Sequence, residues 1–166
     1  MYINLRTGYA WKLDGEFAPA LLFASLGALL TPHDILVVGT YEAKEEIYER
    51  LQRQSNRVPK GRRPYSTTFR FNTVRYPRGR AFEFSANQEN FDLLASLAAI
   101  PGGGIERECF VDHFLCFRPG SPIVPLLDYH DAFLGGDLML TGLYDKEEIK
   151  AFTERLGVQA EMVEYP

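Results

Sequence analysis

The stretch DILVVGTYEAKEEI, residues 34–47, contains both building blocks of this chain. Its four consecutive apolar residues, 35–38, predict a short strand that is buried on both faces. A glycine turn follows, and the acidic residues after it begin a charged helix that we expect at 42–54, because negative charge in the first turn stabilises a helix through its dipole. The segment therefore predicts a strand, a turn and a helix in succession.

A second stretch, DLMLTGLYDKEEI at residues 137–149, resembles the first, with Ala43 as a one-residue insertion. The Ala- and Leu-rich segments that precede the two stretches also share an Ala-Ser-Leu triplet, at 24–26 and 95–97. A duplicated strand–helix unit explains the likeness. The alternative is that every such junction needs a turn glycine and an acidic first helical turn.

The rest of the chain predicts further elements of both kinds. Helices are expected at 16–30, 87–100 and 146–156, from apolar spacing and from turn residues at their ends. The expected strands are 2–13, 109–117, 123–127, 137–143 and 158–165, with a hairpin at 67–85 that turns at Pro77-Arg78-Gly79. At 166 residues the chain suits one domain, 1–166. We expect an α+β fold in which four helices cover a mixed, mostly antiparallel sheet.

Composition excludes several classes of protein. Apolar residues make up 46% and charged residues 24%, which is typical of a globular protein. The N-terminal sequence lacks a basic start followed by an apolar core, so we expect a cytoplasmic protein. The most apolar stretch, 17–30, is too short to span a membrane. Cys109 and Cys116, if they share a strand, lie beyond disulfide reach, which predicts reduced thiols.

Charge is distributed very unevenly along the chain. Residues 50–80 carry ten Lys or Arg and no Asp or Glu, whereas the other residues carry 8 basic and 22 acidic side chains. The formal net charge of −4 therefore combines +10 in this segment with −14 elsewhere. The ten are Arg50, Arg53, Arg57, Lys60, Arg62, Arg63, Arg70, Arg75, Arg78 and Arg80. Such segregation creates a field that a binding partner can detect.

Three interpretations of the basic segment remain open. It could contact a protein partner, as in an inhibitor or immunity protein, because Arg and Tyr are favoured at interfaces. It could bind nucleic acid or another polyanion, with guanidinium groups on phosphates and aromatic rings on bases. It could also pair with the acidic helices at 42–49 and 146–154 of the same chain. The first interpretation makes this a non-catalytic binding protein with contacts at Arg62, Arg63, Arg70, Arg75, Arg78 and Arg80.

A small enzyme is the alternative to a binding protein. The candidate groups are Cys109, Asp112, His113, Cys116, Asp128, His130 and Asp131. As a nucleophile site, either cysteine would need His130 as its base, and no recognised nucleophile motif surrounds them. As a zinc site, the set is unfavourable because strand alternation puts His113 and Cys116 on opposite faces. We expect neither a metal nor a cofactor.

A second binding patch is expected at Asp128, His130 and Asp131. These residues precede Gly135-Gly136, and such loops lie at the surface, where binding residues concentrate. The alternative is a turn whose aspartates accept hydrogen bonds from backbone N–H groups.

Overall fold

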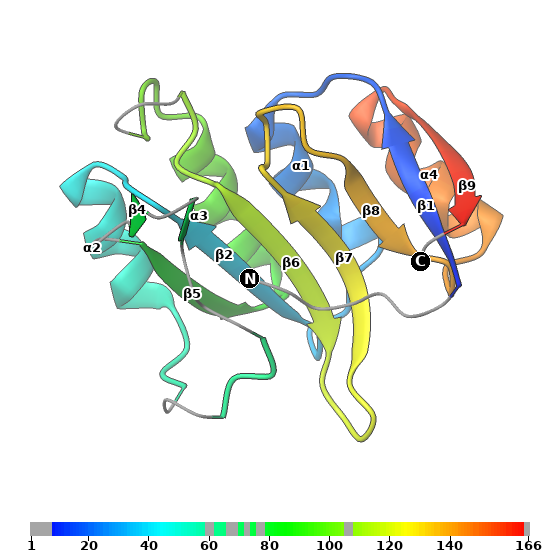
Figure 1. Ribbon diagram of the computed structural model, residues 1–166, viewed down its shortest axis with the longest axis horizontal. Helices are drawn as coiled ribbons and strands as arrows, with labels where there is room; N and C mark the ends of the chain where they lie inside the picture. The colour runs from blue at the N-terminus through cyan, green and yellow to red at the C-terminus, as the bar shows by residue number, and fades with distance from the viewer. Residues whose placement is uncertain are drawn as a thin grey trace.

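A computed structural model describes residues 8–58, 62–65, 70–71, 74–75, 79–104 and 108–164 of the chain. Its main element is a seven-stranded sheet of order β5-β2-β6-β7-β8-β1-β9, in which every pairing is antiparallel (Figure 1). The strands are β1 Tyr9–Asp14, β2 Ile35–Thr40, β5 Arg80–Ser85, β6 His113–Arg118, β7 Val124–His130, β8 Leu138–Thr141 and β9 Gln159–Glu164. The sheet is therefore antiparallel throughout rather than mixed.

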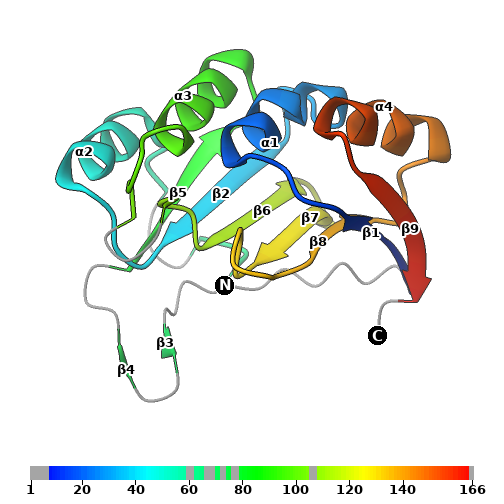
Figure 2. The ribbon, with the colours of Figure 1, turned by 90° about the horizontal axis from the view of Figure 1, so that it is seen from above.

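The four α-helices of the described residues lie on one face of this sheet, in the order α2, α3, α1, α4 across it (Figure 2). They are α1 Pro19–Ser25, continued by the short 3-10 helix η1 Leu26–Ala28, then α2 Glu45–Gln54, α3 Gln88–Ala98 and α4 Lys146–Leu156. The expected α+β fold is confirmed.

Strand alternation assigns each side chain to one of the two faces. Val38, Phe114 and Tyr129 are aligned across neighbouring strands and are buried beneath the helices. The opposite face also has an apolar patch, in which Val37 and Leu115 pack with other buried residues, namely Tyr65, Ala81 and Phe117. β2 is thus apolar on both faces, as the run at 35–38 predicts.

Local capping explains where α3 and α4 begin. The Asn87 side chain accepts a hydrogen bond of 2.9 Å from the Asn90 backbone N–H and caps α3. At α4, Asp145 and Glu148 form a reciprocal capping box with two hydrogen bonds of 2.8 Å. Gly157 ends α4 in the left-handed conformation, with φ of 71°.

The topology has the symmetry of a duplicated unit. β1 and β2 lie four positions apart in the strand order of the sheet. β5 and β8 are also four positions apart, when the order is counted from the opposite end. α1 and α3 contact each other in the middle of the helix layer, with α2 and α4 outside them (Figure 2). These relations describe an approximate two-fold axis at the β6–β7 pair, relating β1-α1-β2-α2 to β5-α3-β8-α4.

The likeness between the two units does not extend to the side chains of their matching tyrosines. The Tyr41 hydroxyl contacts His113 on the helix-free face. The Tyr144 hydroxyl is buried and donates to the Leu29 carbonyl at 3.3 Å. The two units therefore share a topology but have different environments at this position.

The hairpin expected around Pro77-Arg78-Gly79 is replaced by a different one. Instead, β3 (Arg70–Phe71) pairs with β4 (Val74–Arg75). β5 pairs with β2 instead of with the preceding segment. Pro77 and Arg78 lie outside the described residues. The expectation was wrong because a distant strand provides the partner of β5.

A buried ion pair connects β2 to β6. Asp34 is fully buried just before β2, and it accepts hydrogen bonds of 2.8 and 3.1 Å from the Arg118 guanidinium. The same carboxylate accepts a hydrogen bond of 2.9 Å from the Thr31 backbone N–H. Removing the guanidinium would leave a buried carboxylate without its counter-charge, which is destabilising.

Arg118→Ala is therefore expected to lower the free energy of unfolding by about 2 kcal/mol, less than a fully buried pair because the arginine is half exposed. Arg155→Ala, which removes an exposed guanidinium from α4, is the control and should change stability by less than about 0.5 kcal/mol. Urea unfolding followed by circular dichroism measures both. Equal effects of the two substitutions would contradict a structural role for the Asp34–Arg118 pair.

Candidate functional site

Two histidines lie side by side on the helix-free face of the sheet. His113 on β6 is paired directly with His130 on β7, and their ring centroids are 5.2 Å apart. Asp128, two residues earlier on β7, lies on the same face with Oδ1 3.1 Å from His130 Nε2. The structure therefore brings together Asp128 and His130, two of the three residues of the second patch.

Tyr41 completes this group, which we call the histidine cluster (Tyr41, His113, Asp128 and His130). The Tyr41 hydroxyl lies 2.9 Å from His113 Nε2, and the Asp112 carboxylate accepts a hydrogen bond from the Tyr41 backbone N–H. Tyr41 lacks a motif that would have marked it. Strand alternation from Val37 through Gly39 nevertheless places it on this face, and Gly39 lies directly opposite His113.

The hydrogen bonds of His113 define its tautomer. The Asp131 backbone N–H points at His113 Nδ1 over 3.4 Å, and an N–H can only donate. Nδ1 therefore accepts, and the neutral ring carries its proton on Nε2, facing the Tyr41 hydroxyl. In this arrangement His113 is a buried ring held from both sides.

Asp131 has a different role from its two neighbours in the second patch. Its side chain is exposed, and its carbonyl accepts hydrogen bonds from the backbone N–H groups of Leu134 (3.0 Å) and Gly136 (3.3 Å). Gly136 is required in this turn, because a Cβ there would lie 1.8 Å from the His130 carbonyl oxygen. The backbone of Asp131 thus builds the turn, while Asp128 and His130 carry the side-chain contacts.

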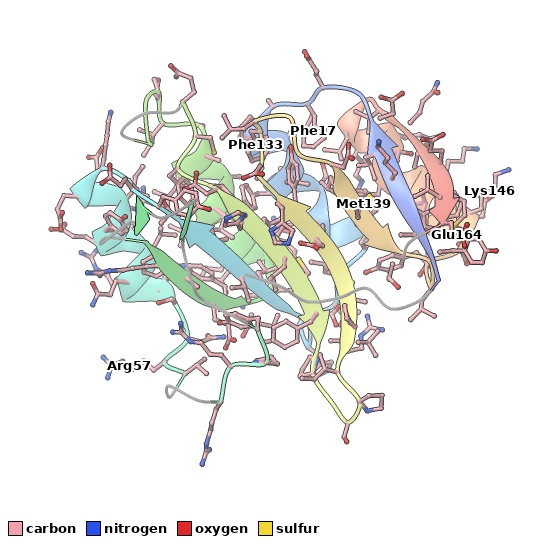
Figure 3. The ribbon with its side chains drawn as sticks, in the orientation of Figure 1. Phe17, Arg57, Phe133, Met139, Lys146 and Glu164 are labelled. Atoms are coloured by element: carbon pink, nitrogen blue, oxygen red, sulfur yellow. The ribbon has the colours of Figure 1, made fainter. Side chains whose placement is uncertain are left out.

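A pocket of about 670 Å³ lies at the same end of β7. Tyr129 lines this pocket, and strand alternation directs its side chain to the opposite face of the sheet from Asp128 and His130. Its lining residues are Gly15, Glu16, Phe17, Pro19, Glu108, Cys109, Tyr129, Ala132, Phe133, Leu134, Gly135 and Gly136. The rings of Phe17 and Phe133 are 6.0 Å apart, and those of Tyr129 and Phe133 are 5.2 Å apart. Figure 3 shows Phe17 and Phe133 next to each other above the ends of the strands.

The pocket contains acidic groups and one buried thiol. Glu16 and Glu108 are exposed, and Glu108 accepts a hydrogen bond of 3.3 Å from the Gly102 backbone N–H. Cys109 is buried, and burial raises the pKa of its thiol to about 11. The thiol is therefore protonated and neutral near pH 7, so the formal charge of the lining comes from the two glutamates.

The described arginines at the other end of the molecule form no close ion pair with a described carboxylate. Among the residues that the structure describes, no carboxylate oxygen lies within 4 Å of a side-chain nitrogen of Arg50, Arg53, Arg57, Arg62, Arg63 or Arg80. Arg80 instead lies over the Tyr48 ring at 5.6 Å, a cation–π contact. The Nε atom of Arg63 is buried without a hydrogen-bond partner.

The remaining predicted arginines are only partly described. Arg70 and Arg75 are paired across β3 and β4, and the structure gives their backbone alone. Arg78 lies outside the described residues. In Figure 3, Arg57 lies at the opposite end of the molecule from Lys146 and Glu164, so α4 is remote from it. The expected pairing of the basic segment with α4 is absent from the described chain.

Comparison with known proteins gives no matching family model, no matching curated protein and no matching solved structure. Within the ranges given above, no helix has the length and apolarity needed to cross a membrane. The described His, Cys, Asp and Glu side chains include no group of three placed to hold a metal ion.

Glu83 on β5 lies on the helix-free face near Arg63, and the pH dependence of its protonation provides a test of this face. The carboxylate is largely buried and accepts a hydrogen bond of 3.3 Å from the Tyr65 hydroxyl. Burial raises the pKa of Glu83 above its ordinary value of 4.5, and this outweighs the hydrogen bond and the nearby Arg63 charge. An acid with a raised folded-state pKa contributes stability below pH 4.5 that is lost as the pH rises through the folded-state pKa.

Glu83→Gln is therefore expected to be more stable than the wild type at pH 7 and similar to it at pH 4, because the amide has no charge to desolvate. Glu161→Gln, an exposed strand position on β9, is the control and should lack this pH dependence. The free energy of unfolding in urea, measured between pH 4 and 7, checks both. A Glu83→Gln difference that is the same at every pH would contradict the assignment.

Proposed function

We propose that this protein binds an acidic surface of another protein through the exposed arginines of α2 and of the segment between α2 and β5, in a non-catalytic role such as inhibitor or immunity protein. The observation that supports the proposal is that these guanidinium groups have no carboxylate within 4 Å in the described chain. The planar guanidinium suits bidentate contacts with carboxylates, and unpaired groups remain available for them.

The neighbourhood of the arginines favours a protein over a nucleic acid as the partner. α2 exposes Glu45, Glu46 and Glu49 on the same helix as Arg50 and Arg53. A phosphate backbone laid along this helix would meet those carboxylates, whereas a protein surface can present charges of both signs. Mixed charge on α2 therefore supports recognition of a patterned surface.

The opposite end of the molecule is acidic and contributes orientation. From Asp137 to Glu164 the chain has seven acidic and three basic residues. β5 and β9 are the outer strands of a seven-stranded sheet, so about 29 Å separates them at 4.8 Å per strand. This separation exceeds the Debye length of about 8 Å at physiological ionic strength. The acidic end therefore acts on the direction of approach more than on the binding energy at the arginines.

The enzyme alternative receives less support from the geometry. Cys116 is fully buried on the helix side of the sheet, opposite the face that carries His113 and His130. Cys109 lines the pocket, but burial raises the pKa of its thiol to about 11, which disfavours the thiolate that a nucleophile needs. Neither histidine is among the described lining residues of the pocket.

The triple variant Arg53→Gln, Arg57→Gln, Arg62→Gln tests the proposal. We expect it to weaken binding of the partner by at least about tenfold, because three contact charges are removed. The matched control is Lys146→Gln, Lys150→Gln, Arg155→Gln, which removes three exposed charges from α4 and should retain binding.

The measurement is affinity capture from nuclease-treated lysate, followed by titration of the captured protein against both variants. Binding that is seen in untreated lysate and lost completely after nuclease treatment would identify a nucleic acid as the partner. Equal weakening by the two triple variants would show that net charge alone matters. Either result would contradict the proposal.

A further inference from the structure

We infer that the pocket beside Phe17, Tyr129 and Phe133 is a binding site for an organic cation, a guanidinium or a quaternary ammonium group. This inference concerns the acidic, aromatic pocket and does not depend on the arginines of the proposed function. The two sites are formed by different elements, and a variant in one leaves the residues of the other unchanged.

The size and walls of the pocket suit a small organic group. Its volume of about 670 Å³ lies within the range of 300–1,000 Å³ that small-molecule sites occupy. The rings of Phe17, Tyr129 and Phe133 are mutually within 5.2 to 6.2 Å, so they form one aromatic surface. Cations are attracted to the faces of such rings by the ring quadrupole.

The charge of the residues that line the pocket determines the sign of the charge that a ligand should carry. Glu16 and Glu108 contribute two carboxylates, and no Lys, Arg or His occurs among the described residues that line the pocket. Neither glutamate has a basic group within 4 Å in the described chain. An anion would be repelled by this lining, and a neutral apolar ligand would gain nothing from the carboxylates.

The polar atoms on the inner side of the pocket carry no compensating positive charge. The Tyr129 hydroxyl accepts a hydrogen bond of 3.0 Å from the Phe133 backbone N–H, and burial raises the pKa of this tyrosine, so it is a neutral phenol. The Cys109 thiol is also neutral near pH 7. The two carboxylates are thus opposed by neutral groups and aromatic rings, an arrangement that a bound cation would complete.

The turn that carries Phe133 is built in an unusual way. Phe133 has a positive φ of 63°, in the left-handed region that bulky residues rarely occupy, whereas Asp131, with φ of 47°, is of a residue type that adopts this region more readily. The Gly136 backbone packs against the His130 carbonyl, where no Cβ fits. The chain therefore adopts a strained conformation that holds the Phe133 ring over the pocket, and such strain concentrates at ligand sites.

The experiment titrates ¹⁵N-labelled protein with choline, with N-acetyl-arginine amide and with 3,3-dimethylbutanol, the neutral isostere of choline. We expect both cations to shift the amide signals of 15–17 and 132–136 saturably, and the alcohol to bind at least tenfold more weakly. Preference for choline would indicate a small quaternary ammonium ligand, and preference for the arginine derivative a side chain of a peptide. Either preference supports a cation site.

Matched variants separate the charge of the pocket from the net charge of the protein. Glu16→Gln, Glu108→Gln should weaken both cations at least tenfold, whereas Glu161→Gln, Glu164→Gln, which removes two exposed carboxylates from β9, should leave them unchanged. Phe133→Leu should also weaken binding while the rest of the amide spectrum is retained. The arginine triple variant should bind both cations like the wild type, so failure of one proposal is distinguishable from failure of the other.

Three results would overturn the inference. These are equal affinity for the alcohol and choline, absence of a saturable shift with either cation, and equal weakening by the two glutamate pairs.

Discussion

The register of β6 against β7, which places His113 opposite His130, is the constraint on which the rest of the structure depends. With this register, Phe114 and Tyr129 point to the helices, while His113, Asp128 and His130 share the opposite face. A slip of one residue would bury the charged groups beneath the helices and expose the aromatic ones. The register therefore determines which side chains form the core, which form the histidine cluster and which aromatic ring of β7 lines the pocket.

The one-sided helix layer determines where function can be located. The β6–β7 pair lies at the centre of the sheet, and the approximate two-fold arrangement places two helices on either side of it (Figure 2). The helices use one face for packing, so the candidate functional groups lie on the other face, at the strand ends and beside the outer strand β5. The histidine cluster, the pocket and the arginines occupy these three places.

Local signals in the sequence predict much of the fold, and non-local contacts account for what they miss. Asn87 and the Asp145–Glu148 pair act within one helical turn, so their helices are predictable from neighbouring residues. The partner of β5 is β2, some forty-five residues away along the chain, and the turn residues near Pro77 contain no information about it. The pocket is formed by three separated segments, 15–19, 108–109 and 129–136, which only the folded topology brings together.

The register of β6 and β7 can be tested directly by nuclear Overhauser spectroscopy on protein labelled at histidine and tyrosine. The ring centroids of His113 and His130 lie 5.2 Å apart, so cross-peaks between their ring protons are expected. Cross-peaks from His113 to the ring of Tyr129 in place of His130 would show a one-residue slip. That result would contradict the assignment of the two faces and, with it, the histidine cluster and the pocket.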